Sequence, residues 1–176
     1  NWVDDQVEQA VAAGFDAFCF TVDSAVYSRR ERDIAGRFKK PWRAYVDDQA
    51  IHYQAALSWD TIARTKAKFD IPVLLKGIAC AEDAALAAEH GVDGLIVSNH
   101  GGRQLDGAPA TIEVLPQIVE AVRSHPDGQA LEIWLDGGIR SGQDVFRALA
   151  LGAQGTFIGK AFLHGLGALG AQGVTR

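Results

Sequence analysis

The sequence predicts an α/β fold with a parallel sheet, and three observations support this prediction. Five short apolar runs, rich in β-branched or aromatic residues, alternate with longer segments in which apolar residues recur every three or four positions. Similar glycine-containing turns follow helical segments, as at 90–94 and 151–155. The chain has 176 residues, 48% of them apolar, which is enough to form one globular domain. This alternation is typical of repeated βα units.

The expected strands and helices follow each other along the chain. Short apolar runs, as buried parallel strands should be, occupy residues 17–22, 72–76, 94–97, 132–136 and 155–158. Helical spacing of apolar residues occupies 4–13, 59–69, 81–90, 112–125 and 141–151. Ser141 is a typical first residue of a helix, and Gly91 and Gly152 are typical residues just after one.

Residues 28–58 interrupt this pattern. The segment is long, rich in charged and aromatic residues, and lacks a clear period until about residue 49. A loop longer than about 15 residues is usually functional or disordered. Because the segment follows a strand directly, we expect a mobile lid over the carboxyl ends of the strands rather than a linker.

Composition excludes two classes of function. The net charge of −5 argues against a nucleic-acid partner, although basic residues cluster at 29–40. No apolar run approaches the roughly 20 residues that a membrane-spanning helix needs. We therefore expect a cytoplasmic protein, with peripheral attachment at the inner membrane as the alternative.

Cys19 and Cys80 both lie among apolar residues, without the spacing of a redox pair or the His/Cys cluster of a zinc site. We expect buried, reduced thiols and no metal. The chain contains no methionine and begins at Asn1, so we also expect its native N-terminus to lie outside this sequence.

Polar residues follow every predicted strand, at 21–23, 76–77, 98–103, 136–140 and 159–160. Any one of them could be a structural cap or ion pair, but five in succession predict the rim of an active site. The last two stretches place glycines before Arg140 and Lys160, a pattern that suits a phosphate group. A tight turn between strand and helix is the alternative interpretation of these glycines.

The stretch 98–104, Ser-Asn-His-Gly-Gly-Arg-Gln, resembles the active-site signature of FMN-dependent α-hydroxy-acid oxidases and dehydrogenases. This group includes glycolate oxidase, lactate oxidase, mandelate dehydrogenase and flavocytochrome lactate dehydrogenase. The resemblance continues in order at 21–23, 29–33, 57–59, 74–77, 136–140 and 150–159, so it covers nearly the whole chain.

The resemblance implies a TIM (β/α)₈ barrel, of which residues 1–176 would be the C-terminal portion, about strands four to eight of one FMN-binding domain. A complete barrel needs about 250 residues. Strands four and eight would then be open edges with unpaired backbone groups. Either this is a fragment of a longer protein, which we favour, or a partner chain closes the sheet. We expect the isolated fragment to be inactive.

The family reaction implies roles for four residues. An L-α-hydroxy acid such as lactate, glycolate or mandelate is oxidised to the 2-oxo acid, with oxygen, a quinone or a cytochrome as the final electron acceptor. His100 matches the base, and Asp23 matches the carboxylate that pairs with it. Arg103 matches the clamp for the substrate carboxylate, and Arg30 matches a second arginine near the substrate. A satisfied core histidine and a solvated surface arginine are the alternatives for His100 and Arg30.

The cofactor FMN is implied in the same way. Lys76 matches the lysine beside the pyrimidine edge of the flavin, where negative charge collects on reduction. Thr21 and Ser98 match residues that hydrogen-bond the flavin ring.

At the other end of the cofactor, Asp136, Gly138 and Arg140 match contacts to the ribityl chain and phosphate. At Gly159 and Lys160 the sequence departs from the usual Gly-Arg of the family. Lysine keeps the charge but loses the planar fork, so we expect weaker or differently arranged phosphate binding.

Two alternatives stay open at this point. One is another phosphate-binding FMN β/α-barrel oxidoreductase, and the other is a catalytically inactive barrel fragment. We expect a homo-oligomer when the protein is full length. The hydroxy acid itself is not predicted, because in the family its side-chain pocket is built largely from the absent half and the variable lid.

Overall fold

The computed structural model describes residues 1–25, 30–37 and 55–175. Within them, one sheet contains β1 (Phe18–Thr21), β2 (Val73–Ile78), β3 (Gly94–Val97), β4 (Glu132–Leu135) and β5 (Gly155–Thr156). The α-helices are α1 (Trp2–Ala12), α2 (Glu31–Ala35), α4 (Trp59–Lys68), α5 (Ala81–Glu89), α6 (Thr111–Ser124), α7 (Gly142–Ala150), α8 (Lys160–Leu169) and α9 (Ala171–Val174). Single 3-10 turns lie at His100–Gly102 and Pro126–Gly128.

The sheet confirms the predicted parallel α/β arrangement. Its strands lie in sequential order, β1-β2-β3-β4-β5, and every neighbouring pair is parallel. Each predicted strand and helix has a counterpart near its predicted position. β2 runs two residues further than predicted because its register shifts between Lys76 and Ile78, which lets the pairing resume beyond Gly77. β5 is shorter than predicted and ends at Thr156.

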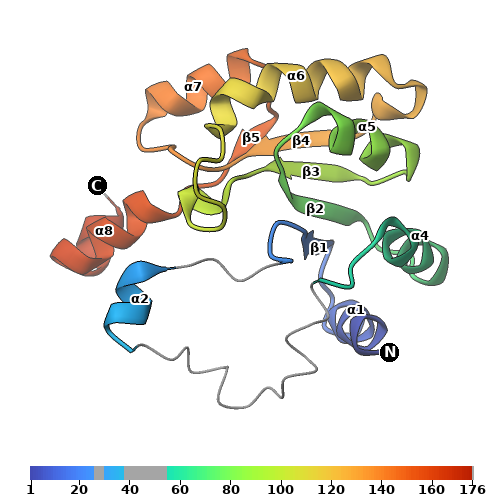
Figure 1. The fold of residues 1–176 in the computed structure, drawn as a ribbon, viewed down its shortest axis with the longest axis horizontal. Helices are drawn as coiled ribbons and strands as arrows, with labels where there is room; N and C mark the ends of the chain where they lie inside the picture. The colour runs from blue at the N-terminus through green and yellow to red at the C-terminus, as the bar shows by residue number, and fades with distance from the viewer. Residues whose placement is uncertain (26–29, 38–54, 176) are drawn as a thin grey trace.

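Helices α5, α6 and α7 cover one face of the sheet (Figure 1). The core lies between these layers, because alternate strand residues point to the same face. From the strands it receives Leu75, Leu95 and Leu135, and from the helices Ala87 and Ile118, all buried. The small alanines of α5 allow that helix to pack closely, and the branched residues of the strands fill the layer beneath it.

The opposite face of the sheet is more open among the described residues. Glu132 is exposed and Trp134 is half-buried, although Ile133 between them is completely buried. Cys19 lies on this open face and is exposed, and Cys80, just before α5, is exposed as well. The prediction that both cysteines are buried is therefore wrong. Apolar neighbours in sequence do not bury a strand residue whose own side chain points to the uncovered face.

The two outer strands, β1 and β5, are the edges of this sheet. The predicted lid at 28–58 lies largely outside the described residues. Its described part includes the short helix α2, which the sequence did not predict, and the residues leading into α4. The helices α8 and α9 after β5 were not predicted either, and α8 presents exposed Phe162, Leu163 and Leu166.

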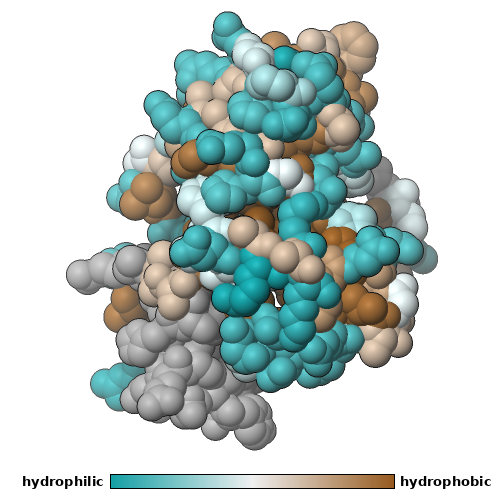
Figure 2. Space-filling model, turned by 90° about the vertical axis from the view of Figure 1, so that its right-hand side faces the viewer, coloured by the Kyte–Doolittle hydropathy of each residue, from teal (hydrophilic) through white to brown (hydrophobic). Residues whose placement is uncertain are grey.

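The side of the molecule that carries α1 and α4 is mostly hydrophilic, with small scattered apolar patches (Figure 2). There the carboxylate of Asp4 in α1 lies 3.2 Å from Lys68 Nζ and 3.5 Å from Arg64 Nε in α4. These ion pairs connect α1 to α4. Across the described ranges, we find no helix with the length and apolar character needed to cross a membrane.

Candidate functional site

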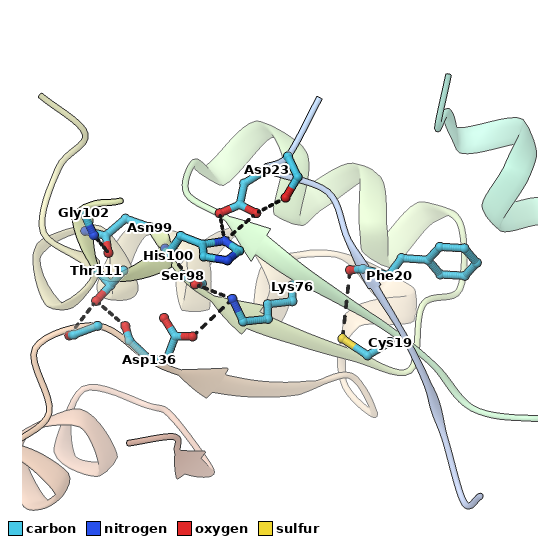
Figure 3. Close-up of polar contacts among 12 residues, drawn as sticks. Cys19, Phe20, Asp23, Lys76, Ser98, Asn99, His100, Gly102, Thr111 and Asp136 are labelled. Atoms are coloured by element: carbon cyan, nitrogen blue, oxygen red, sulfur yellow. Dashed lines mark hydrogen bonds and ion pairs between the residues drawn. The ribbon is translucent and has the colours of Figure 1, made fainter. Parts of the chain in front are cut away.

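Side chains predicted for an active site meet at the carboxyl ends of adjacent strands. Asp23 follows β1 and Lys76 lies near the end of β2, whereas His100 follows β3 and Asp136 follows β4. Because the strands are parallel and in sequential order, these ends lie along one edge of the sheet. Figure 3 shows His100 directed at Asp23, and Lys76 directed at Asp136.

The carboxylate of Asp23 holds the imidazole of His100. The ring nitrogen Nδ1 lies 3.1 Å from Oδ1 and 3.0 Å from Oδ2 of Asp23. Gly77 makes room for this carboxylate, because a Cβ atom at that position would lie 2.7 Å from both Cβ and Cγ of Asp23. Gly77 also has a φ of +109°, which a side chain would strain. The sequence therefore needs glycine there to place the partner of His100.

The loop that carries His100 has a left-handed backbone. His100, Gly101 and Gly102 have φ values of +57°, +65° and +71°. This conformation is uncommon for a non-glycine residue and persists where surrounding contacts hold it. Two such contacts come from within the loop: the backbone N–H of His100 donates to Ser98 Oγ at 3.1 Å, and that of Gly102 donates to Asn99 Oδ1 at 3.2 Å.

Lys76 connects the two neighbouring strand ends. Its Nζ donates to Ser98 Oγ at 3.0 Å and lies 3.3 Å from Asp136 Oδ2. Ser98 is buried, so its hydroxyl oxygen receives both the ammonium of Lys76 and the backbone N–H of His100. The position of the His100 loop is therefore linked to the charged pair of Lys76 and Asp136 beside it.

Asp136 offers an unused acceptor at the same place. Its Oδ1 is buried and has no hydrogen-bond partner within the described part of the chain. Thr111 fixes the backbone nearby, since its hydroxyl donates to the carbonyls of Asp136 at 2.6 Å and Gly137 at 3.2 Å. A buried acceptor without a donor is costly, so Oδ1 suits a hydroxyl group of a bound ligand.

An open cleft of about 1050 Å³ extends from these residues toward α7 and α8. Its lining includes seven cationic or titratable basic side chains: Lys76, His100, Arg103, Arg140, Arg147, Lys160 and His164. The carboxylates in the lining are Asp136 and Asp144. The excess of basic groups makes the cleft suited to an anionic ligand.

The N-terminus of α7 is capped by a capping box formed by Ser141 and Asp144. Asp144 Oδ2 accepts the backbone N–H groups of Arg140 and Ser141, each at 3.1 Å, and the Ser141 hydroxyl at 3.0 Å. The hydrogen bond from the Ser141 side chain, followed by that from the Arg140 backbone, lowers the pKa of Asp144 below its ordinary value. The guanidinium of Arg140 forms no hydrogen bond with the described residues, although it lines the cleft.

The structure brings most of the predicted site residues together. Eight of the predicted residues line the cleft. They are Lys76, His100, Arg103, Asp136, Gly138, Arg140, Gly159 and Lys160. Asp23 and Ser98 lie directly behind this lining, in contact with His100. Thr21 pairs with Lys76 in the sheet but does not line the cleft, and neither does Arg30, which precedes α2.

The whole chain matches the sequence pattern of a known protein family. The sequence pattern described as "FMN-dependent dehydrogenase" matches residues 1–176, the whole chain. The chain belongs to this family. The predicted resemblance is therefore confirmed, and FMN is the cofactor on which the family depends.

Individual proteins are similar to this chain over nearly its whole length. A peroxisomal (S)-2-hydroxyacid oxidase of Arabidopsis thaliana is 42% identical over 97% of the chain and 50% of its own length. An L-lactate oxidase of Nostoc sp. is 41% identical over 96% of the chain and 51% of its own length. The crystal structure of mandelate oxidase with 3,3-difluoro-2-hydroxy-3-phenylpropionic acid superposes with a TM-score of 0.81 at 44% identity, covering 97% of the chain and 49% of that protein. The chain thus spans about half the length of these relatives.

The residues of the cleft fit FMN. Arg140 offers a guanidinium that the described residues leave without a hydrogen bond, and Gly138, with a φ of +86° and open space around it, exposes its backbone to a ligand. These features suit a phosphate. The unused Oδ1 of Asp136 suits a hydroxyl of the ribityl chain, and the ammonium of Lys76 suits the negative charge of a reduced ring.

Three residues that position the site were not singled out from the sequence. Gly77 clears space for Asp23, Asn99 closes the His100 loop, and Thr111 holds the backbone of Asp136. A glycine within a strand was the available signal for Gly77, because such glycines often mark a bulge or a close approach. Thr111 acts through a tertiary contact that carries no pattern in the sequence, whereas Asn99 forms a local hydrogen bond of the kind that asparagine side chains form in turns.

Proposed function

We propose that this chain supplies the base and the cofactor-phosphate end of an FMN-dependent site that oxidises an L-α-hydroxy acid to a 2-oxo acid. The observation that carries the proposal is the hydrogen-bonded contact of His100 with Asp23, at one end of a basic, glycine-lined cleft. In this proposal β1 to β5 are strands four to eight of a (β/α)₈ barrel. Substrates of the lactate, glycolate or mandelate type are proposed because relatives of this chain are named glycolate oxidase, L-lactate oxidase and mandelate oxidase.

His100 is the base in this proposal. Its Nδ1 faces Asp23, so the neutral ring carries its proton on Nδ1 and leaves the lone pair of Nε2 to accept a proton. Nε2 takes the proton of the substrate hydroxyl as the carbinol C–H bond breaks and the C–O bond becomes a carbonyl. The negative charge of Asp23 then stabilises the imidazolium that has formed.

Arg103 is the proposed clamp for the substrate carboxylate. It follows the His100 loop, lines the cleft, and forms no hydrogen bond or ion pair with the described residues. Its planar guanidinium can donate two parallel hydrogen bonds to a carboxylate. Arg30 stays a second candidate for this role, supplied from the segment that precedes α2.

The remaining residues are assigned to the cofactor. When bound, FMN supplies the two-electron acceptor for the α-hydrogen and its electron pair. Lys76 places a positive charge beside the ring, and Thr21 and Ser98 lie on the same side of the sheet edge to hold it. Asp136 and Gly138 hold the ribityl chain, whereas Arg140, Gly159 and Lys160 surround the phosphate. Oxygen is the proposed final electron acceptor, because the relatives described above are named oxidases.

The length of the chain bears on how the site is completed. Relatives of about twice this length carry the activity, so we propose that turnover requires residues beyond these 176. Those residues would cover the open face of the sheet and the edges of β1 and β5. A homo-oligomer and a cytoplasmic location stay predictions.

The test is reduction of bound flavin by substrate, in the complete protein that contains these residues. Under anaerobic conditions, L-lactate, glycolate and (S)-mandelate are added in turn and the flavin absorbance is followed. We expect bleaching by at least one L-α-hydroxy acid and recovery when oxygen is admitted. A protein that retains FMN but is bleached by none of them contradicts the proposal and favours a different FMN-dependent reaction.

A further inference from the structure

Besides the pairing of His100 with Asp23, the loop that carries His100 receives a contact to its backbone from a distant part of the chain. Lys160, the first residue of α8, donates from its Nζ to the backbone carbonyl of Gly101 at 2.6 Å. The two residues are 59 positions apart in the sequence. The His100 loop follows β3 and α8 follows β5, and β4 lies between these two strands. The bond therefore joins two parts of the cleft lining that come from strands that are not neighbours.

We propose that Lys160 is a positioning residue, which fixes the left-handed loop and thereby the direction of the His100 ring. His100 is a non-glycine residue with a φ of +57°, and such backbone is retained only where contacts determine it, whereas Gly101 and Gly102 adopt positive φ without strain. Ser98 and Asn99 fix the N–H groups of His100 and Gly102. Among the described residues, Lys160 is the donor to the carbonyl between them.

The end of the Lys160 side chain lies close to the backbone of residue 101. A Cβ atom at Gly101 would lie 3.4 Å from both Cε and Nζ of Lys160. This distance is ordinary van der Waals contact, so glycine at position 101 is explained by its φ of +65°, and Lys160 packs directly against the backbone there.

The contact also links the two ends of the cleft. The ammonium of Lys160 has three donors, and one is directed at Gly101. The others remain available to an anion near Gly159 and Arg140. A phosphate bound there would hold Lys160 in place, so occupation of the phosphate end would stabilise the loop that carries the base.

The test measures hydrogen exchange of the backbone amides at 99–103, in the complete protein, with and without inorganic phosphate or FMN. This inference rests on the proposed function only in naming His100 as the base, and the exchange measurement requires no turnover. We expect Lys160→Met to raise exchange in the loop about fivefold, a factor expected from loss of one charge-assisted hydrogen bond in a solvated setting. Lys160→Arg, which keeps donors at this position, should retain most of the protection.

Lys66→Met is the matched control. Lys66 makes a contact of the same length, 2.6 Å to Asp93 Oδ2, but it lies in α4. The control should leave exchange at 99–103 unchanged. In the wild type, inorganic phosphate or FMN should slow exchange further, and this response should be lost in Lys160→Met.

Activity provides the second readout. If flavin is bleached by a hydroxy acid, Lys160→Met should lower the bleaching rate at saturating substrate by more than it raises the half-saturating substrate concentration. Equal exchange in Lys160→Met and the wild type would overturn the positioning role, whatever the activity. If exchange in the three variants follows these expectations but no hydroxy acid bleaches the flavin, the proposed function is contradicted and the positioning role of Lys160 is not.

Discussion

The two ends of the cleft differ in how completely their polar groups are paired. At the His100 end, the imidazole, the Lys76 ammonium and the Ser98 hydroxyl all have partners within 3.3 Å. At the Arg140 end, the guanidinium of that residue forms no hydrogen bond with the described residues. A proton-transfer group needs a fixed direction before substrate arrives, whereas an anion site needs donors that are not already used. The difference matches the two roles proposed for these ends.

Replacing His100 with alanine should have the largest effect. We expect the rate of flavin bleaching by substrate to fall about 10³-fold, because among the described residues no other basic side chain pairs with Asp23 and could take the hydroxyl proton. FMN should remain bound, since the groups around Arg140 are untouched, and the flavin spectrum reports this directly. His125→Ala, at the far end of α6, is the control. A His100→Ala protein that bleaches at nearly the wild-type rate would show that another group is the base.

Gly77→Ala tests the same end without removing a polar group. The added methyl lies 2.7 Å from the Asp23 side chain, so the carboxylate must shift away from His100. We expect bleaching to slow about 30-fold, in the range observed when a catalytic group is displaced by about 1 Å. Gly142→Ala is the matched control, because a Cβ atom there meets nothing within 4 Å. Equal rates in the two variants would mean that Asp23 does not orient the base.

Arg140→Met tests the opposite end. Loss of a charged donor to the phosphate should raise the Kd for FMN about tenfold, which flavin fluorescence quenching measures. Binding should also depend less on salt than in the wild type, because one cationic contact is gone. Arg64→Met, in α4 and paired with Asp4, provides a control of the same charge change. An unchanged Kd and salt dependence would remove Arg140 from the phosphate site.

The smallest effect concerns the support of Arg140 by Asp144. The pKa of Asp144 is lowered by hydrogen bonds that exist only in the folded state, so the charged carboxylate stabilises the fold above its unfolded pKa. This contribution is lost as the pH falls through the lowered pKa. Asp144→Asn should therefore reduce the Tm at pH 7, and the difference from the wild type should shrink toward pH 3.

Ser141→Ala gives the comparison for that titration. It removes the side-chain hydrogen bond that contributes most to the lowered pKa of Asp144 but keeps the carboxylate and its backbone hydrogen bonds. The loss of Tm, from a cap worth about 1 kcal/mol, should therefore depend on pH less than that of Asp144→Asn. A Tm difference for Asp144→Asn that is the same at pH 7 and pH 3 would contradict the role of the charge.

The sequence predicted the elements of the fold better than their surroundings. Period and length were enough for the strands and for helices such as α6 and α7, because these signals are local. Cys19 was misjudged because burial depends on which face of the sheet another layer covers. The helices α2 and α8 were missed, since α2 is short and α8 is interrupted by glycines that weaken its pattern.

By itself, the sequence determined the parallel βα order, the stretch 98–104 and the family to which the chain belongs. These follow from residue types at fixed spacing. Tertiary structure alone decided that Gly77 accommodates Asp23, that Asp136 retains a buried unused oxygen, and that Lys160 reaches the carbonyl of Gly101. Each of these depends on distances between atoms on different strand ends, which are set only when the sheet brings those ends together.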